Sequence, residues 1–176
     1  PTVMFAYIAE RNIKSMLSGT FYAVLLISGV ILVALKNVRL GMISLVPNLL
    51  PAGLAFGLWG LLVGQVNMAV AVVAGMALGV VVDDSVHFLS KYQIARRDEK
   101  LSPKDAVIFA FTGVGTALFV TTIILAAGFF ILVQSSFGLN SYMASLTAIA
   151  LIMALIADLT LLTALLIAVD KDTPSE

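Results

Sequence analysis

The chain has 176 residues, of which 61% are hydrophobic and 11% are charged, and its ten basic and ten acidic residues cancel to a net charge of zero. A soluble domain averages about 25% charged residues, so this composition indicates a membrane-embedded protein, and zero net charge argues against a nucleic-acid-binding surface. The chain has no cysteine and one histidine, His87. Disulfides, thiolate chemistry and a multi-histidine metal site are therefore excluded, and we expect no metal or other cofactor.

Five segments have the length and hydrophobicity of membrane-spanning helices, for which about twenty apolar residues cross roughly 30 Å of hydrocarbon. They cover residues 15–35, 40–64, 66–90, 107–133 and 141–169. A polar break at residues 134–140 separates the last two, and no charged residue occurs from residue 106 to residue 157. Transmembrane β-strands would be near ten residues long with alternating polarity, and these segments are neither. The sequence thus predicts an all-α, polytopic membrane protein with a bundle of about five transmembrane helices.

The basic residues predict the orientation of this bundle. With five spans, the turn at 36–40, the loop at 91–105 and the C-terminal tail share one side, and this side holds eight of the ten Lys and Arg residues. Basic loops stay in the cytoplasm, so we expect a cytoplasmic C-terminus, an extracytoplasmic N-terminal segment and a location in the cytoplasmic (inner) membrane. Because the chain begins at Pro1 and arrives from outside, we also expect it to be a piece of a longer polypeptide.

The loop at 91–105 carries the densest charge in the chain. It is either a solvated loop or a contact with anionic lipid, and it is long enough for an extra helix. Within it, Ser102 followed by Pro103 predicts a helix N-cap with proline at the first helical position.

Two adjacent acids, Asp83 and Asp84, lie inside the third segment. An ionised carboxylate in hydrocarbon costs about 2.5–3.5 kcal/mol, so such groups normally face a bundle interior or a water-filled cavity. Two neighbouring carboxyl groups in a low dielectric should not both be ionised and should titrate as a coupled pair, which is what a proton-driven transporter needs. Alternatively, the acids lie at a helix end and reach water beside Lys91. Asp84 is rotated by about 100° from Asp83, so the two need not share a partner.

Four weaker polar candidates accompany the acids. His87 is four residues after Asp83 and three after Asp84, within reach of both on a helix, and is either a relay group or an interfacial histidine. Asp158, midway through the fifth segment, is either a third relay acid or an anchoring hydrogen bond to a neighbouring helix. Thr121 and Thr122 either take part in the relay or bond their own helix backbone.

Small residues and prolines predict how the helices pack. Gly75, Gly79 and Asp83 recur every four residues, so one helix face is small enough for a neighbouring helix to approach closely. Pro47 and Pro51 should break or kink the second helix, because each removes a backbone hydrogen-bond donor.

Three motifs resemble the resistance-nodulation-division superfamily, and its MMPL-type exporters in particular. They are PNLLP at residues 47–51, LGVVVDDSVHFL at 78–89 ahead of a basic loop, and ADLTLL at 157–162. Residues 3–16 look like the family's approach from an extracytoplasmic domain into the bundle. The match covers essentially the whole chain.

The resemblance implies a protein of two similar halves, each with one helix, a large extracytoplasmic domain and five more helices. This chain would be the last five helices of one half, expected to be the C-terminal half, and Asp83 and Asp84 match the family's proton-relay aspartates. The same unit resembles the sterol-sensing segment of Patched-like proteins. The implied partners are membrane lipids, a hydrophobic substrate and the remainder of the transporter; a homo-oligomer is an open alternative.

These observations favour the transmembrane module of a proton-driven exporter of lipids or other hydrophobic molecules, with protons as the coupling ion and no enzymatic activity. The alternative is a sterol-sensing, lipid-sensing or interaction module that transfers no protons. An intramembrane aspartyl protease that uses Asp83 and Asp158 is disfavoured, because the usual Gly-x-Gly-Asp signature is missing before Asp83.

Overall fold

The structure is a computed structural model that describes residues 2–35, 38–64 and 68–170. These residues form five helical rods and contain no strand. The first three rods are α1 (Thr2–Leu35), α2 (Val38–Leu62) and α3 (Met68–Arg97). The fourth consists of α4 (Pro103–Ala110), the π-helical segment η1 (Phe111–Gly115) and α5 (Thr116–Val133); the fifth consists of α6 (Gly138–Ala157), the π-helical segment η2 (Asp158–Leu162) and α7 (Thr163–Val169).

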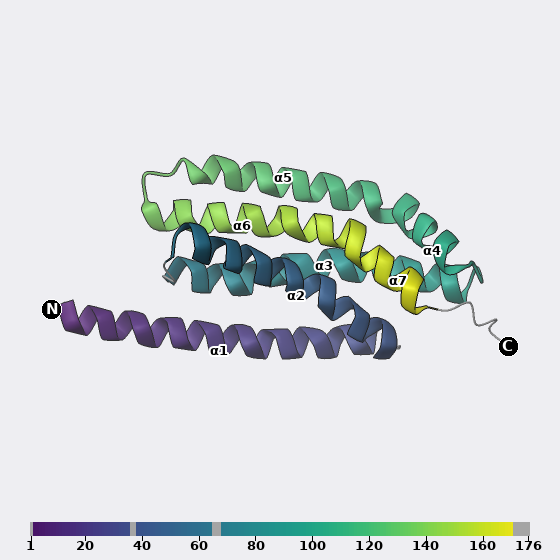
Figure 1. The fold of residues 1–176 in the computed structure, drawn as a ribbon, viewed down its shortest axis with the longest axis horizontal. Helices are drawn as coiled ribbons and strands as arrows, with labels where there is room; N and C mark the ends of the chain where they lie inside the picture. Colours follow the sequence, from purple (N-terminus) through teal and green to yellow (C-terminus); the bar gives the residue numbers. More distant parts are fainter. Residues whose placement is uncertain (1, 36–37, 65–67, 171–176) are drawn as a thin grey trace.

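The rods run alongside one another and reverse direction at each connection (Figure 1). α6 packs against α5 on one side and against α2 and α3 on the other, and α1 packs on α2 and α3. The ends of α1, α3 and α7 and the start of α4 lie at one end of the bundle, at the right of Figure 1. This is the end for which the basic residues predict a cytoplasmic position.

Four of the described helices are long and apolar enough to cross a membrane: Glu10–Val33, Leu45–Leu62, Pro103–Val133 and Gly138–Val169. α3 contacts α1, α2, α4 and α6 and completes the bundle. Its 30 residues extend over about 45 Å at 1.5 Å per residue. The predicted fold class, an all-helical polytopic membrane bundle, is confirmed.

Several helices are longer than the hydrophobic segments that predicted them. α1 starts at Thr2 rather than near residue 15, and an ion pair between Lys14 Nζ and Glu10 Oε1 at 2.7 Å stabilises this polar extension. α3 continues to Arg97, so only residues 98–102 of the expected loop at 91–105 are non-helical. The expected break at 134–140 is likewise shortened, because α6 begins at Gly138. The predicted start of the third segment at residue 66 lies outside the described residues.

Two local predictions have clear outcomes. Ser102 caps α4, because its Oγ accepts a hydrogen bond from the Asp105 amide at 3.3 Å, and Pro103 is the first helical residue, as predicted. Pro47 and Pro51 are buried inside α2, and α2 is continuous through both of them. Of the two predicted outcomes, the break is therefore absent, and the kink stays a prediction.

Two apolar clusters of buried side chains form the core, and a polar layer lies between them. The first, the Trp59 cluster, contains Ala55, Trp59, Val73, Ala77, Leu146 and Ala150. The second, the Tyr92 cluster, contains residues such as Phe88, Leu89, Tyr92, Ala106, Leu162 and Leu166. Along α3 and along the fifth rod, the residues between these clusters include Ser85 and Asp158, which places buried polar groups at the middle of the bundle.

Candidate functional site

Three polar side chains from three different helices meet in the middle of the bundle. Asn48 of α2, Ser85 of α3 and Asp158 of η2 have exposed fractions of 1%, 0% and 7%. Ser85 Oγ lies 2.6 Å from Asn48 Oδ1 and 2.8 Å from Asp158 Oδ1. We call these three residues the polar junction. They tie α2, α3 and η2 together at one level.

Helical spacing places these side chains inside the bundle. On α3, Ser85 follows Val81 by four residues and precedes Leu89 by four, and all three are buried on one face. In the fifth rod, Asp158 follows Ala154 by four residues and precedes Leu162 by four, and these also are buried. The apolar neighbours bury the junction on the inner faces of its helices.

The ionisation state of Asp158 and the orientation of the Asn48 amide are linked through the single hydroxyl proton of Ser85. A serine hydroxyl carries one proton, yet Ser85 Oγ contacts two oxygens. In the first arrangement a protonated Asp158 donates to Ser85, which then donates to Asn48 Oδ1. In the second, Ser85 donates to an ionised Asp158, and the Asn48 amide is turned so that Nδ2 donates to Ser85, an assignment equally open to asparagine. The junction can therefore hold a proton or give it up without losing its contacts.

Asp84 lies next to the junction and connects it to the fourth rod. The carboxyl group of Asp84 is half-buried, and it interacts with the Thr122 hydroxyl and with the charges of Asp83, His87 and Asp158. Thr122 is buried on α5 and donates to the Leu118 carbonyl oxygen at 2.8 Å. The structure thus brings together three of the predicted relay residues, Asp84, Asp158 and Thr122.

Asp83 and His87 face away from the junction. Their side chains are 74% and 66% exposed, and His87 Nε2 lies 3.7 Å from Asp83 Oδ1. Gly75 and Gly79 lie on the same face of α3 and are exposed as well. A Cβ atom at Gly79 would have no described atom within 4 Å, and one at Gly75 would lie 3.4 Å from Thr20 Oγ1 of α1. Hence the close helix approach predicted for this face is made at Gly75 by α1, and no described residue makes it at Gly79.

Thr121 is not part of the site. It is exposed, and its hydroxyl donates to the carbonyl oxygens of Ala117 and Leu118 at 2.8 and 3.1 Å. This is the backbone bonding that the sequence offered as the alternative to a relay role. For Asp158, the alternative of an anchoring hydrogen bond to a neighbouring helix is present, through Ser85 of α3.

One of the two π-helical segments of the described residues begins at the polar junction. Asp158 is the first residue of η2, and η1 ends one residue before α5, which carries Thr122. A π-helical turn holds an extra residue and so rotates the next part of the helix relative to a regular α-helix, and such turns often occur at functional sites. In the fifth rod, the turn begins at the one buried acid of the described residues.

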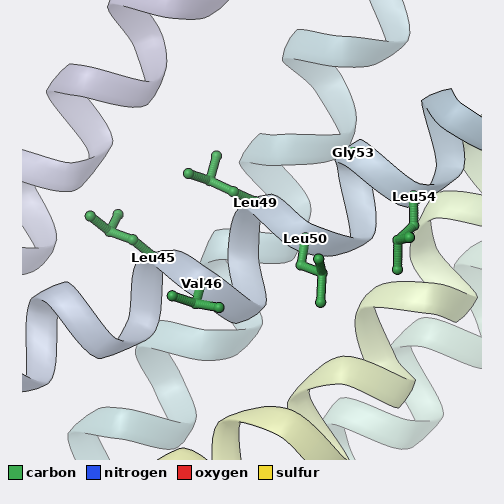
Figure 2. A pocket seen from close by; sticks show the side chains of 6 residues that line it. All are labelled: Leu45, Val46, Leu49, Leu50, Gly53 and Leu54. Atoms are coloured by element: carbon green, nitrogen blue, oxygen red, sulfur yellow. The ribbon is translucent and has the colours of Figure 1, made fainter.

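An apolar groove runs along the outer face of α2. It has a volume of about 450 Å³ and is lined by Leu45, Val46, Leu49, Leu50, Gly53 and Leu54. In Figure 2, Leu45 and Leu49 point to one side of α2, toward α1, and Val46, Leu50 and Leu54 point to the other. No polar surface lines it, and it lies in a helix that is apolar enough to cross the membrane.

A second polar cluster closes the predicted cytoplasmic end. Arg96 Nε donates to Asp170 Oδ2 at 2.8 Å, and the buried Tyr92 donates its hydroxyl proton to the same oxygen at 2.6 Å. Another guanidinium nitrogen of Arg96 donates to the Leu101 carbonyl oxygen at 2.6 Å. This cluster fastens the end of α3 to the end of α7 and to the short loop before α4.

Sequence reasoning missed Ser85 and Asn48 as site residues. Both stood inside motifs that were noted for other reasons, Ser85 beside the acids and Asn48 between two prolines. A signal was present, since Ser85 shares a helical face with the apolar Val81 and Leu89. In the described part of the chain, no group of three or more His, Cys, Asp or Glu residues could hold a metal ion.

Comparison with known proteins places this arrangement in a family. The sequence model of the MMPL family matches residues 1–173. A protein of Methanocaldococcus jannaschii, named "Putative membrane protein MJ1562", is 29% identical over 155 residues, which cover 85% of this chain and 39% of that protein. The chain therefore spans less than half the length of this relative. Because the family match extends over nearly the whole chain, the chain belongs to the MMPL family of membrane proteins.

Proposed function

We propose that the chain is the transmembrane module of an exporter that uses the proton-motive force to move lipids or other hydrophobic molecules. The observation that carries the proposal is the buried Asp158, which Ser85 connects to Asn48 and which lies close enough to Asp84 to interact with it. A structural anchor needs no ionisable group at this position. A proton carrier does.

The energy available fits such a role. One proton that moves down a potential of 100 mV releases about 2.3 kcal/mol. Uptake of a proton by Asp158 reverses the direction of hydrogen bonds across the polar junction. That change acts on α2, α3 and η2 together, so it can bias how these helices pack.

Asp83 and His87 are the proposed entry to this pathway. They lie on the exposed face of α3, and Asp84, which is half-buried, is intermediate in burial between them and the junction. Protons would pass from the Asp83–His87 pair to Asp84 and on to Asp158, with Thr122 as a hydrogen-bonding partner of Asp84. Thr121 has no part in this route.

The exposed face of α3 supports a further expectation, that the remainder of the exporter covers it. An ionised Asp83 facing lipid would cost about 2.5–3.5 kcal/mol. Protein or water must therefore cover the face that contains Gly79, Asp83 and His87. The other half of a two-half transporter is the proposed cover, and the fact that the chain spans 39% of its relative's length agrees with this.

The test is efflux by the full-length protein in cells that have a maintained proton gradient. We expect the double variant Asp83→Asn with Asp84→Asn, and separately Asp158→Asn, to abolish efflux while membrane expression survives. Asp98→Asn, a change of the same chemistry at an exposed position after α3, should leave efflux intact. Undiminished efflux in the Asp158→Asn and double variants would overturn the proposal.

A second candidate is a lipid-binding module that transfers no protons, and the apolar groove on α2 favours it. Its test is photo-crosslinking of a lipid that carries a reactive group on its acyl chain. This function predicts that the lipid labels Leu49 and Leu50. Gly53→Phe should reduce the labelling because it fills the groove, whereas a change of pH or Asp158→Asn should leave the labelling unchanged. Efflux that is sensitive to Asp158→Asn would favour the exporter instead.

We propose that the bundle lies in the cytoplasmic membrane, with residues 98–102 on the cytoplasmic side and residues 134–137 on the outer side. The chain has no cysteine, so single cysteines can be introduced without background. A cysteine at Glu99 should react with an impermeant maleimide only after the cells are opened, and one at Ser136 should react in intact cells. The reverse pattern would invert the topology.

A further inference from the structure

A small cavity lies between α1, α2 and α3, beside the polar junction. Ser28 and Asn48 line it, together with apolar residues of the three helices such as Ile31, Leu45 and Leu78. It leaves about 10 Å³ free for a water molecule. A single buried water needs about 10–15 Å³ of such space, and it needs two to four polar groups as hydrogen-bond partners.

Two polar side chains line the cavity, and one of them, Asn48, has a buried N–H group that needs a hydrogen-bond acceptor. Asn48 is 1% exposed, and its Nδ2 has no hydrogen-bond partner among the described residues. An amide N–H that is buried without a partner costs about 1–3 kcal/mol. Ser28 Oγ donates its proton to the Val24 carbonyl oxygen at 2.6 Å, so its lone pairs remain able to accept.

We infer that this cavity binds one ordered water molecule, which forms a hydrogen bond with the Asn48 side-chain amide and donates one to Ser28 Oγ. Hydrocarbon cannot be the occupant, because a lipid chain would leave the amide unsatisfied. The water extends the polar junction into a chain of groups, from Asp158 through Ser85 and Asn48 to Ser28. This chain crosses the bundle from η2 to α1.

The role of the water rests on the proposed function, although the site itself does not. When Asp158 is protonated, Ser85 donates to Asn48 Oδ1 and Nδ2 donates to the water. When Asp158 is ionised, the turned amide presents Oδ1 to the cavity, and the water donates to it. Of the titratable groups in the described part of the chain, Asp84 is the one that acts on Asp158. The protonation state of Asp158 in η2 thereby affects the hydrogen bonds between α1 and α2.

The test is a structure of the full-length protein in lipid nanodiscs, at a resolution that shows ordered waters, combined with hydroxyl-radical labelling of residues beside bound water. We expect density within hydrogen-bond distance of both the Asn48 amide and Ser28 Oγ, and labelling of Leu45 and Leu78. Asn48→Leu should remove both signals. Asn140→Leu, the same change at an exposed position of α6, should remove neither.

Ser28→Ala gives a second check that preserves the fold, since it deletes one partner and no apolar contact. We expect the density to weaken and the labelling to fall, whereas Ser18→Ala on the exposed side of α1 changes nothing. A cavity that is empty or filled by a lipid chain in the unaltered protein would overturn the inference. The outcome is separable from the transport proposal, because Asp158→Asn should stop efflux and yet keep the water.

Discussion

Replacing Ser85 by alanine removes one hydroxyl group and, with it, both contacts of the polar junction. Ser85 is fully buried, and its Oγ lies 2.6 Å from Asn48 Oδ1 and 2.8 Å from Asp158 Oδ1. Hydrogen bonds between helices in membranes average about 0.6 kcal/mol and reach about 1.7 kcal/mol. The loss of two such bonds should lower the stability of the bundle by about 1.2 kcal/mol, with an upper value of about 3.4 kcal/mol.

The stability change can be measured by steric trapping in bicelles, with a pair of biotin tags placed at exposed positions of the described residues. Ser90→Ala, at an exposed position of the same helix, is the matched control and should change the free energy of unfolding little. Ser85→Ala should also impair efflux, since a proton on Asp158 could no longer act on α2. If the Ser85 and Ser90 variants were equally stable, the junction would not hold the three helices together.

Two further predictions concern the ends and the open face of the bundle. Arg96→Gln removes the charged partner of Asp170 at a partly exposed site, so it should destabilise the full-length protein by about 1–3 kcal/mol and increase proteolysis of residues 98–102. Arg97→Gln, at an exposed position, should have little effect. Equal effects of the two changes would mean that the Arg96–Asp170 contact does not stabilise this end of the bundle. Gly79→Leu should disrupt assembly of the full-length protein, as seen in its thermal stability, if the remainder of the exporter packs there as proposed. Gly128→Leu, which also meets open space among the described residues, should be tolerated. A harmless Gly79→Leu would mean that lipid or water faces this glycine.

The number and order of the helices could be predicted from the sequence, because about twenty apolar residues can cross a bilayer only as a helix. The ends of the helices could not. Hydropathy reports which residues tolerate lipid, whereas backbone hydrogen bonding decides where a helix stops. α1 therefore extends back to Thr2 and α3 extends to Arg97, through charged residues that are compatible with a helix outside the hydrocarbon.

The candidate site was predicted in part. The cost of a buried charge identified Asp84 and Asp158, and the 100° rotation between neighbours allowed Asp83 to face elsewhere. That cost does not distinguish which of two adjacent acids faces the bundle, since this depends on where the other helices lie. It also passes over Ser85 and Asn48, because uncharged polar groups in a span cost little to place and their importance comes from meeting across helices.

The π-helical turn at Asp158–Leu162 had no sequence signal that we recognised. Its residues are typical of an ordinary α-helix, and the extra residue in the turn is stabilised by contacts with α2 and its neighbours. Periodicity alone assumes a uniform helix and therefore does not anticipate the rotation that such a turn introduces.

The proposed proton-driven export depends on one event, the binding and release of a proton by the carboxyl group of Asp158 inside the bundle. Infrared difference spectroscopy of the full-length protein in lipid measures this directly, through the C=O stretch of a protonated carboxylic acid. We predict a band that appears and disappears reversibly as the pH is changed, that is absent in Asp158→Asn and that is retained in Asp98→Asn. An Asp158 that remained ionised at every pH at which the protein exports its substrate would contradict this mechanism.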